Sequence, residues 1–90
     1  MTLSVTPPVP EWLAQRAGAI QPGLRPETRF VLIGGQPMYR LDVRPAAGLF
    51  SCAIVNATNS HRLDDGGKTY PSPDSALAGG LEELREKLGW

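Results

Sequence analysis

Three residues of the kind that perform hydrolysis lie close together in the sequence: Ser60, His61 and Asp64. A hydroxyl, an imidazole and a carboxylate form a catalytic triad when they converge on a rigid scaffold beside an oxyanion hole. Adjacent residues of an extended chain point to opposite faces, so Ser60 and His61 are not expected to act as partners. We therefore expect His61 to be a solvated loop residue and the protein not to be an enzyme.

Metal ligation is the second chemistry that His61 suggests, because Asp64 and Asp65 follow it. A calcium loop needs at least four alternating oxygen ligands and a closing Glu, which is missing here. Zinc sites use Cys and His in pairs, whereas this chain has one of each. The single cysteine, Cys52, lies in an apolar run, which indicates a buried structural thiol. We expect neither a metal site nor a cofactor.

A glycine pair, Gly34-Gly35, follows an apolar run and could suggest a phosphate-binding loop. No G-x-G-x-x-G or G-K-[ST] pattern accompanies it, and Gln36-Pro37 comes next instead of a helix start. The pair is therefore predicted to form a hairpin turn.

Arginines supply the only nucleic-acid signal in the sequence. Arg40 and Arg44 alternate with apolar residues and would share one strand face, which Arg29 could join from a neighbouring strand. Asp42 lies between the first two on that face, and aromatic residues interleaved for base stacking are missing. Nine basic and nine acidic residues also cancel to a net charge of zero. A wet face with an internal ion pair is favoured, and nucleic-acid binding through these arginines is kept as the alternative function.

Two tryptophans, Trp12 and Trp90, lie near the ends of the chain. Each ring has two alternatives: it folds back onto the core, or it sits at a partner interface, where Trp is enriched. Both residues are therefore candidates for an interface.

Length and composition set the scale of the fold. Ninety residues, 41% of them hydrophobic, suffice for one core, so we predict a single α+β domain over residues 11–90 after an extended Pro-rich arm over residues 1–10. No apolar run approaches the length of a membrane span, and the N-terminus lacks a signal-peptide pattern. The expected location is cytoplasmic, without membrane contact.

Several apolar runs separated by turn residues predict strands. Residues 29–33 are β-branched and aromatic, Tyr39, Leu41 and Val43 alternate with charged residues, and residues 49–57 are apolar enough for a central strand. Segments 61–63 and 68–70 flank Asp64-Asp65-Gly66-Gly67, which is typical of a tight turn. The expected sheet is an antiparallel meander.

Two helices are predicted, one at each end of the domain. The apolar spacing from Pro10 to Ile20 favours a short amphipathic helix. The second helix begins after Ser72 as a cap and ends at Gly89. Its members divide into an apolar stripe of Leu77, Leu81, Leu84 and Leu88 and a wet face that includes Glu82, Glu83, Arg85, Glu86 and Lys87. The internal pair Gly79-Gly80 is interpreted as a point of close approach to the sheet, with a bend as the alternative.

The passage from Gly67 to Leu84 (GKTYPSPDSALAGGLEEL) resembles the strand-to-helix passage of small β-β-β-α domains. It is similar to HicB-like antitoxin domains and to the double-stranded-RNA-binding fold, over residues 39–89 at most. The RNA-binding family has a lysine cluster where this chain has Pro73-Asp74-Ser75. The HicB-like resemblance fits the charge better and implies a module that binds protein or oligomerises, and neither resemblance transfers a functional residue.

These observations together predict an α+β fold. Its three- to four-stranded antiparallel meander carries a C-terminal helix, and a short N-terminal helix, on one face. The expected function is a small non-enzymatic protein-interaction or oligomerisation module with an unidentified protein partner, and a homodimer is one form that it could take. A small core, an open sheet edge and terminal tryptophans support this prediction.

Overall fold

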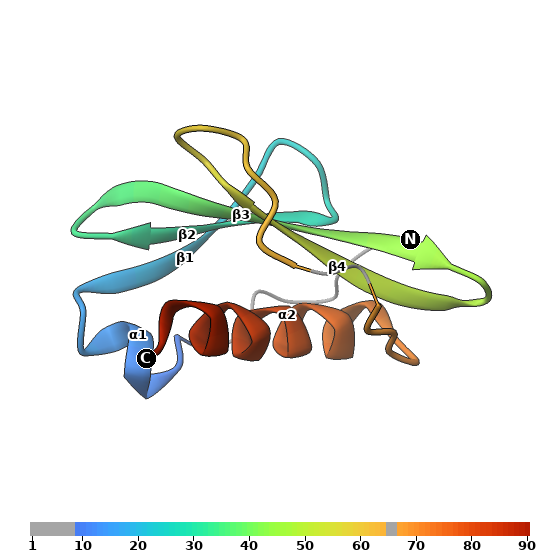
Figure 1. The fold of residues 1–90 in the computed structure, drawn as a ribbon. Coiled ribbons are helices and arrows are strands. Elements are labelled where there is room, and N and C mark those ends of the chain that lie inside the picture. The colour runs from blue at the N-terminus through green and yellow to red at the C-terminus, as the bar shows by residue number, and fades with distance from the viewer. Residues whose placement is uncertain (1–8, 65–66) are drawn as a thin grey trace.

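A computed structural model describes residues 9–64 and 67–90. Figure 1 shows four strands in one antiparallel sheet, with the longer helix lying across one face. In chain order the elements are α1 (Glu11–Ala14), β1 (Gly18–Pro22), β2 (Thr28–Ile33), β3 (Gln36–Ala46), β4 (Leu49–Asn56) and α2 (Pro73–Leu88). The strand order β1-β2-β3-β4 is a meander, and α2 packs on β3 and β4. The predicted α+β class and its antiparallel meander are confirmed.

Side-chain alternation along β3 separates the two faces of the sheet. Leu41 and Val43 are completely buried in the core cluster that includes the leucines of α2. Arg40 and Arg44 lie on the opposite face and stay partly exposed. Residues two apart in a strand share a face, so the apolar and charged sets remain separate from Tyr39 to Arg44.

The core lies between this sheet and the helices. Its largest fully buried side chains come from α1, three strands and α2: Leu13, Val31, Leu41, Val43, Ile54, Leu77 and Leu84. The short helix α1 thus contributes one fully buried side chain, Leu13, although it consists of a single turn.

The β2–β3 connection is the hairpin turn that the glycine pair predicted. Gly34 has φ of 62° and Gly35 has φ of 82°. A two-residue hairpin turn with positive φ at both positions matches the twist of the flanking strands, and glycine adopts that conformation at no steric cost. The phosphate-loop alternative has no helix after it to complete it, because β3 begins at Gln36.

Helix α2 begins and ends where the sequence predicts. The hydroxyl of Ser72 accepts the backbone N–H of Ser75, whose own hydroxyl accepts the N–H of Ser72 in a reciprocal capping box. Gly89 closes the helix in the left-handed conformation, with φ of 73°. The predicted leucine stripe faces the core, with Leu77, Leu81 and Leu84 buried and the fourth leucine half-buried at the helix end.

The glycine pair inside α2 marks close packing, as interpreted from the sequence, and α2 runs through it without interruption. A Cβ on Gly80 would lie within 2.9 Å of the Cβ of Cys52 and closer still to its Sγ, while one on Gly79 would meet the ring of Tyr70. This approach has a consequence that the sequence did not predict. Glu83, assigned to the wet face, is only 4% exposed. Because α2 packs so closely on the sheet, residues at the border of its apolar stripe, such as Glu83, are buried as well.

The N-terminal helix is much shorter than predicted. It ends at Ala14, and residues 18–22 form β1, which pairs with β2. Ala17 turns the chain with a positive φ of 53° and accepts the backbone N–H of Gly34. The prediction failed because Gly18 weakens a helix, and because pairing with the free edge of β2 is a tertiary gain that local spacing does not reveal.

The segment after β4 also differs from the prediction. The expected hairpin between residues 61–63 and 68–70 does not form, since Arg62 forms a bridge with Val55 and Tyr70 forms one with Phe50. Both arms therefore lie along β4 and cover its outer edge. Residues 65–66 at the centre of the predicted turn, and residues 1–8 of the predicted arm, lie outside the described residues.

Candidate binding face

The face of the sheet turned away from α2 is here named the open face. Its residues on β2 and β3 include Thr28, Phe30, Arg40, Asp42 and Arg44, as the strand register requires. In Figure 1 two loops rise on this side of the sheet, one between β1 and β2 and one after β4. These two loops border the open face, so it is not a flat surface.

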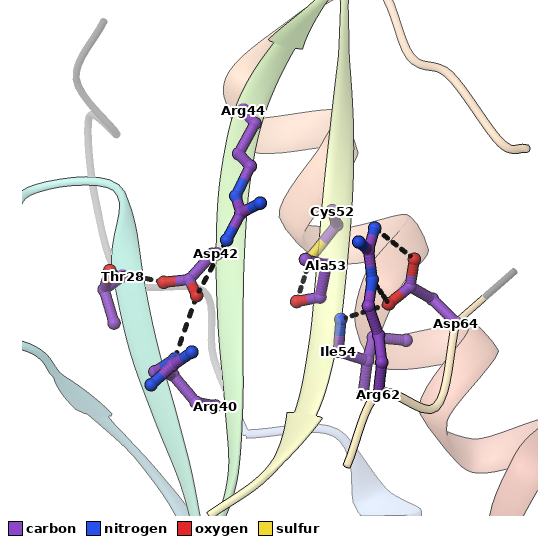
Figure 2. A network of polar contacts seen from close by, with 9 residues as sticks. All are labelled: Thr28, Arg40, Asp42, Arg44, Cys52, Ala53, Ile54, Arg62 and Asp64. Atoms are coloured by element: carbon purple, nitrogen blue, oxygen red, sulfur yellow. Dashed lines mark hydrogen bonds and ion pairs between the residues drawn. The ribbon is translucent and has the colours of Figure 1, made fainter. Parts of the chain in front are cut away.

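An arginine–aspartate–arginine row lies along β3 on the open face. Oδ2 of Asp42 accepts a hydrogen bond from Nε of Arg40 at 2.9 Å and lies 3.8 Å from Nη2 of Arg44. Its other oxygen, Oδ1, accepts the hydroxyl hydrogen of Thr28 at 2.6 Å. Figure 2 shows both guanidinium groups directed toward this one carboxylate. The internal ion pair predicted from the sequence is confirmed.

The row combines a buried anchor with two accessible cations. The side chain of Asp42 is 13% exposed, whereas those of Arg40 and Arg44 are 41% and 56% exposed. Because one carboxylate holds two guanidinium groups, the row retains a net positive charge. Each guanidinium carries five N–H donors in a fixed fork, and Asp42 uses only part of that capacity.

A groove of about 590 Å³ opens beside the row. It extends from the β1–β2 loop across β2 to β3. Its lining combines three arginines, two acids and a threonine with apolar residues: Leu24, Arg25, Glu27, Thr28, Phe30, Arg40, Asp42, Val43, Arg44 and Pro45. A volume of this size is within the range of pockets that bury a ligand or a few side chains.

A second hollow of about 270 Å³ continues the groove toward β1. It shares Leu24 and Phe30 with the first and is otherwise lined by Gln21, Pro22, Gly23 and Pro37. Leu24 is completely exposed, at 104% of its reference surface, although it is a large apolar residue. The open face therefore has a charged end along β3 and an apolar end at the β1–β2 loop.

Leu24, Arg25 and Phe30 were not identified as candidates from the sequence. A signal for the first two existed, because an apolar and a basic residue lie between Pro22-Gly23 and Pro26, where turn residues leave side chains at the surface. Phe30 carried no such signal. Its face depends on its register against Arg40, which only the paired strands reveal.

Arg29 does not belong to the open face, which corrects the expectation that it joins Arg40 and Arg44. It is paired with Leu41, so it shares the helix side of the sheet, and it is only 6% exposed. Its Nη1 donates to the carbonyl oxygens of Pro26 and Thr28, each at 2.8 Å. Arg29 thus braces the loop that carries Leu24, and it is not available to a ligand on the open face.

The two tryptophans meet each other at one end of the molecule. The ring centroids of Trp12 and Trp90 are 6.0 Å apart with an interplanar angle of 52°, and Cζ of Arg16 lies 4.3 Å from the centroid of the Trp90 ring. Arg85 also donates to the carbonyl oxygen of Trp90 at 3.1 Å. The two rings thus contact each other within one chain, Trp12 also packs against the core, and both rings keep part of their surface exposed.

The triad residues do not converge. Asp64 accepts hydrogen bonds from Nε and Nη2 of Arg62 and from the backbone N–H of Ile54, as Figure 2 shows. Burial would raise the pKa of Asp64, but these hydrogen bonds and the charge of Arg62 outweigh it and hold the pKa below its ordinary value. His61 is exposed, and its backbone N–H is bonded to Oδ1 of Asn59. Asp64 thus has a structural role at the edge of β4.

Cys52 is a buried thiol, as the sequence predicted, and it packs against Gly80. Burial, with smaller contributions from the charges of Asp64, Asp42 and Glu83, raises the pKa of its thiol to about 12. The reactive thiolate is therefore suppressed at neutral pH. Among the described residues, no group of three or more His, Cys, Asp or Glu side chains is arranged to hold a metal ion.

Comparison of the chain with protein-family models, with curated proteins and with solved structures gave no match. Over residues 9–64 and 67–90, no helix is both long enough and apolar enough to cross a membrane. The assignment of function therefore rests on the geometry of the open face.

Proposed function

We propose that this protein is a non-enzymatic interaction module that binds a protein partner on the open face. The observation that carries the proposal is the groove in which the row of Arg40, Asp42 and Arg44 lies beside the exposed Leu24 and Phe30. Arginine and aromatic residues are enriched in the energetically dominant parts of protein interfaces. The resemblance to HicB-like antitoxin domains is in accord with a protein partner.

The row is suited to binding because it is held in place before a partner arrives. Asp42 fixes the guanidinium of Arg40 through a hydrogen bond of 2.9 Å, and Thr28 fixes Asp42 in turn. Ordering a long side chain on association costs about 0.5–1.5 kcal/mol, and a side chain that is already held avoids part of that cost. A non-catalytic role agrees with the inert thiol and the separated triad residues, and the free Cys52 agrees with a reducing, cytoplasmic location.

Single-stranded nucleic acid is the second candidate ligand of the same face. Three arginines, at positions 25, 40 and 44, line the groove together with Phe30, on which a base could stack. Two carboxylates, Glu27 and Asp42, lie in the same groove and repel phosphate, and the whole chain has no net charge. The protein partner is preferred for this reason, and a second copy of the chain is one form that this partner could take.

Capture of partners from extracts of the native host tests the proposal. Three immobilised chains are compared: the natural one, Arg40→Gln/Arg44→Gln, and Lys87→Gln, which removes a positive charge from the exposed side of α2. The natural chain and the Lys87 variant should capture the same partners, and the double variant should not capture them. Each partner, once purified, should bind the natural chain directly. Equal capture by all three chains contradicts the proposal.

Two further measurements separate the alternatives. Light scattering at about 0.1 mM gives a doubled mass if the partner is a second copy, whose weak association such a concentration would reveal. An oligothymidylate of about 20 nucleotides, long enough to span one binding site, tests the nucleic-acid candidate. Tight binding of the oligonucleotide, weakened by salt and lost in the double variant, favours that candidate over the protein partner.

A further inference from the structure

We infer that the segment bound on the open face is an extended protein segment whose acidic side chains contact Arg40 and Arg44; this inference deepens the proposed function and rests on it. The chemistry follows from the hydrogen-bond donors that remain on the row. Nε of Arg40 donates to Asp42, so the two terminal amino groups of this guanidinium are left for another acceptor. Over residues 9–64 and 67–90, the only hydrogen bond of these two side chains is the one from Arg40 to Asp42, and Arg44 meets Asp42 as an ion pair at 3.8 Å.

The acceptor that matches these donors is a carboxylate. Guanidinium and carboxylate groups are planar and pair through two parallel N–H···O bonds, which gives both strength and orientation. The carboxylate of Asp42 already has both oxygens engaged, by Thr28 on one side and by the arginines on the other. It therefore cannot satisfy the remaining donors, and a carboxylate from a partner can.

The spacing of the arginines indicates the shape of the segment. Arg40 and Arg44 are four residues apart on one strand and share a face, so their Cα atoms are separated by about 13 Å. Their guanidinium groups converge, because the two nitrogens that face Asp42 lie 2.9 Å and 3.8 Å from the same oxygen and are thus at most about 7 Å apart. An extended segment running along β3 presents every second side chain to the sheet, about 7 Å apart. Acidic residues separated by two or four positions then meet the row in register.

The apolar end of the groove adds a second requirement. Leu24 is completely exposed, and Phe30 lies between the two hollows and opposite Arg40 in the register. Apolar contact at these two side chains calls for an apolar residue next to the acidic ones in the partner. A nucleic-acid base could stack on Phe30, but Glu27 and Asp42 oppose the continuous negative charge of the phosphodiester backbone. An acidic and apolar protein segment satisfies both ends of the groove.

Selection from a library of random peptides tests the inference. Peptides of about twelve residues, sufficient to extend along the whole of β3, are first depleted on the Arg40→Gln/Arg44→Gln chain and then selected on the natural chain. The recovered sequences should be enriched in Asp and Glu, at spacings of two or four, beside a Leu, Phe or other large apolar residue. A recovered set that is neutral or basic, or the recovery of no peptide, overturns the inference.

The affinity of a recovered peptide provides the quantitative check. Binding measured by fluorescence anisotropy should weaken at least tenfold when the peptide acids are changed to amides, and equally when the two arginines are replaced. It should weaken between about 50 mM and 500 mM NaCl, since exposed ion pairs are screened, and Lys87→Gln should leave it unchanged. An affinity that is unchanged when the peptide acids are replaced by amides overturns the inference.

The two proposals fail in different ways. If host partners are captured through the open face but selected peptides lack acids, the acidic-segment inference falls and the interaction function stands. If host capture is insensitive to the arginines, the interaction function itself falls. Tighter binding of the oligothymidylate than of every selected peptide overturns both in favour of nucleic acid.

Discussion

The two faces of the sheet are built from alternating residues of the same strands, yet they are held together differently. On the helix side, Leu41 and Val43 of β3 are removed from water completely and meet the leucines of α2. On the open face, Arg40 and Arg44 remain partly exposed to water, and both contact the largely buried carboxylate of Asp42. Burial of apolar surface contributes most of the stability of a domain, whereas exposed ion pairs contribute little. Substitutions on the two faces should therefore separate stability from binding.

The largest separation is expected between Leu84→Ala and Phe30→Ala. Leu84 is fully buried, so its truncation leaves a cavity and should lower the free energy of unfolding by about 2–5 kcal/mol. Phe30 is only partly buried on the open face, and its truncation should cost about 1 kcal/mol because it removes less buried apolar area than truncation of Leu84. Urea unfolding measures both, and binding of a selected peptide should respond in the opposite order. Equal losses of stability would show that the open face is packed as tightly as the core.

A second prediction concerns how closely α2 packs against the sheet. Gly80→Ala places a methyl group against Cys52 and should cost about 1–3 kcal/mol, partly offset by the better helix propensity of Ala. In a Cys52→Ala background the sulfur is gone, and the same substitution should cost less than half as much. A double-mutant cycle by chemical unfolding gives this coupling. An equal cost in both backgrounds would show that the sulfur of Cys52 is not what excludes a side chain at position 80.

The tryptophan pair joins the two helices, and its contribution should be smaller. Trp90→Ala removes a tilted aromatic contact and a cation–π contact with Arg16, together worth about 1–2 kcal/mol. Arg16→Gln should remove only the smaller, cationic part. Thermal unfolding measures the loss, and the emission of Trp12 should shift to the red as its ring becomes hydrated. If Trp90→Ala leaves stability unchanged and instead lowers the mass of an oligomer, the interface alternative for this residue is correct.

The helix side of the molecule was largely predictable from the sequence because its signals are local. Ser72 and Gly89 mark the ends of α2 through their own backbone chemistry, and the leucine period fixes the buried stripe. The alternation on β3 likewise placed Arg40 and Arg44 together. Arg29 was misplaced because its face depends on the register between β2 and β3, a relation between residues twelve positions apart that no local pattern encodes.

Beyond the turn signal at Leu24 and Arg25, the groove itself could not be read from the sequence. It exists because the β1–β2 loop stands beside β3, and β1 exists because residues 18–22 pair with β2 instead of continuing a helix. Strand pairing between segments is a tertiary gain, which outweighs weak local preference. The same reason explains Arg62 and Tyr70, whose flanking turn residues favoured a hairpin while β4 offered each of them an unpaired edge.

The smallest expected change in stability, and the one most sensitive to pH, concerns Asp64 at the outer edge of β4. Asp64 accepts the N–H of Ile54 and pairs with Arg62, so Asp64→Asn should cost about 1 kcal/mol at neutral pH. The cost is kept small because Arg62 is 53% exposed and water screens its charge. The pKa of Asp64 is lower in the folded chain than in the unfolded one, so its charge stabilises the fold at pH values above the ordinary carboxyl pKa of 3.8. That contribution is lost as the pH falls through the lower folded value, and the unfolding curves of the natural chain and of Asp64→Asn should therefore converge in acid. A difference that stays constant from neutral pH to about pH 2, where the carboxylate would be protonated in both states, would mean that Asp64 acts through its shape alone and that the edge of β4 owes nothing to charge.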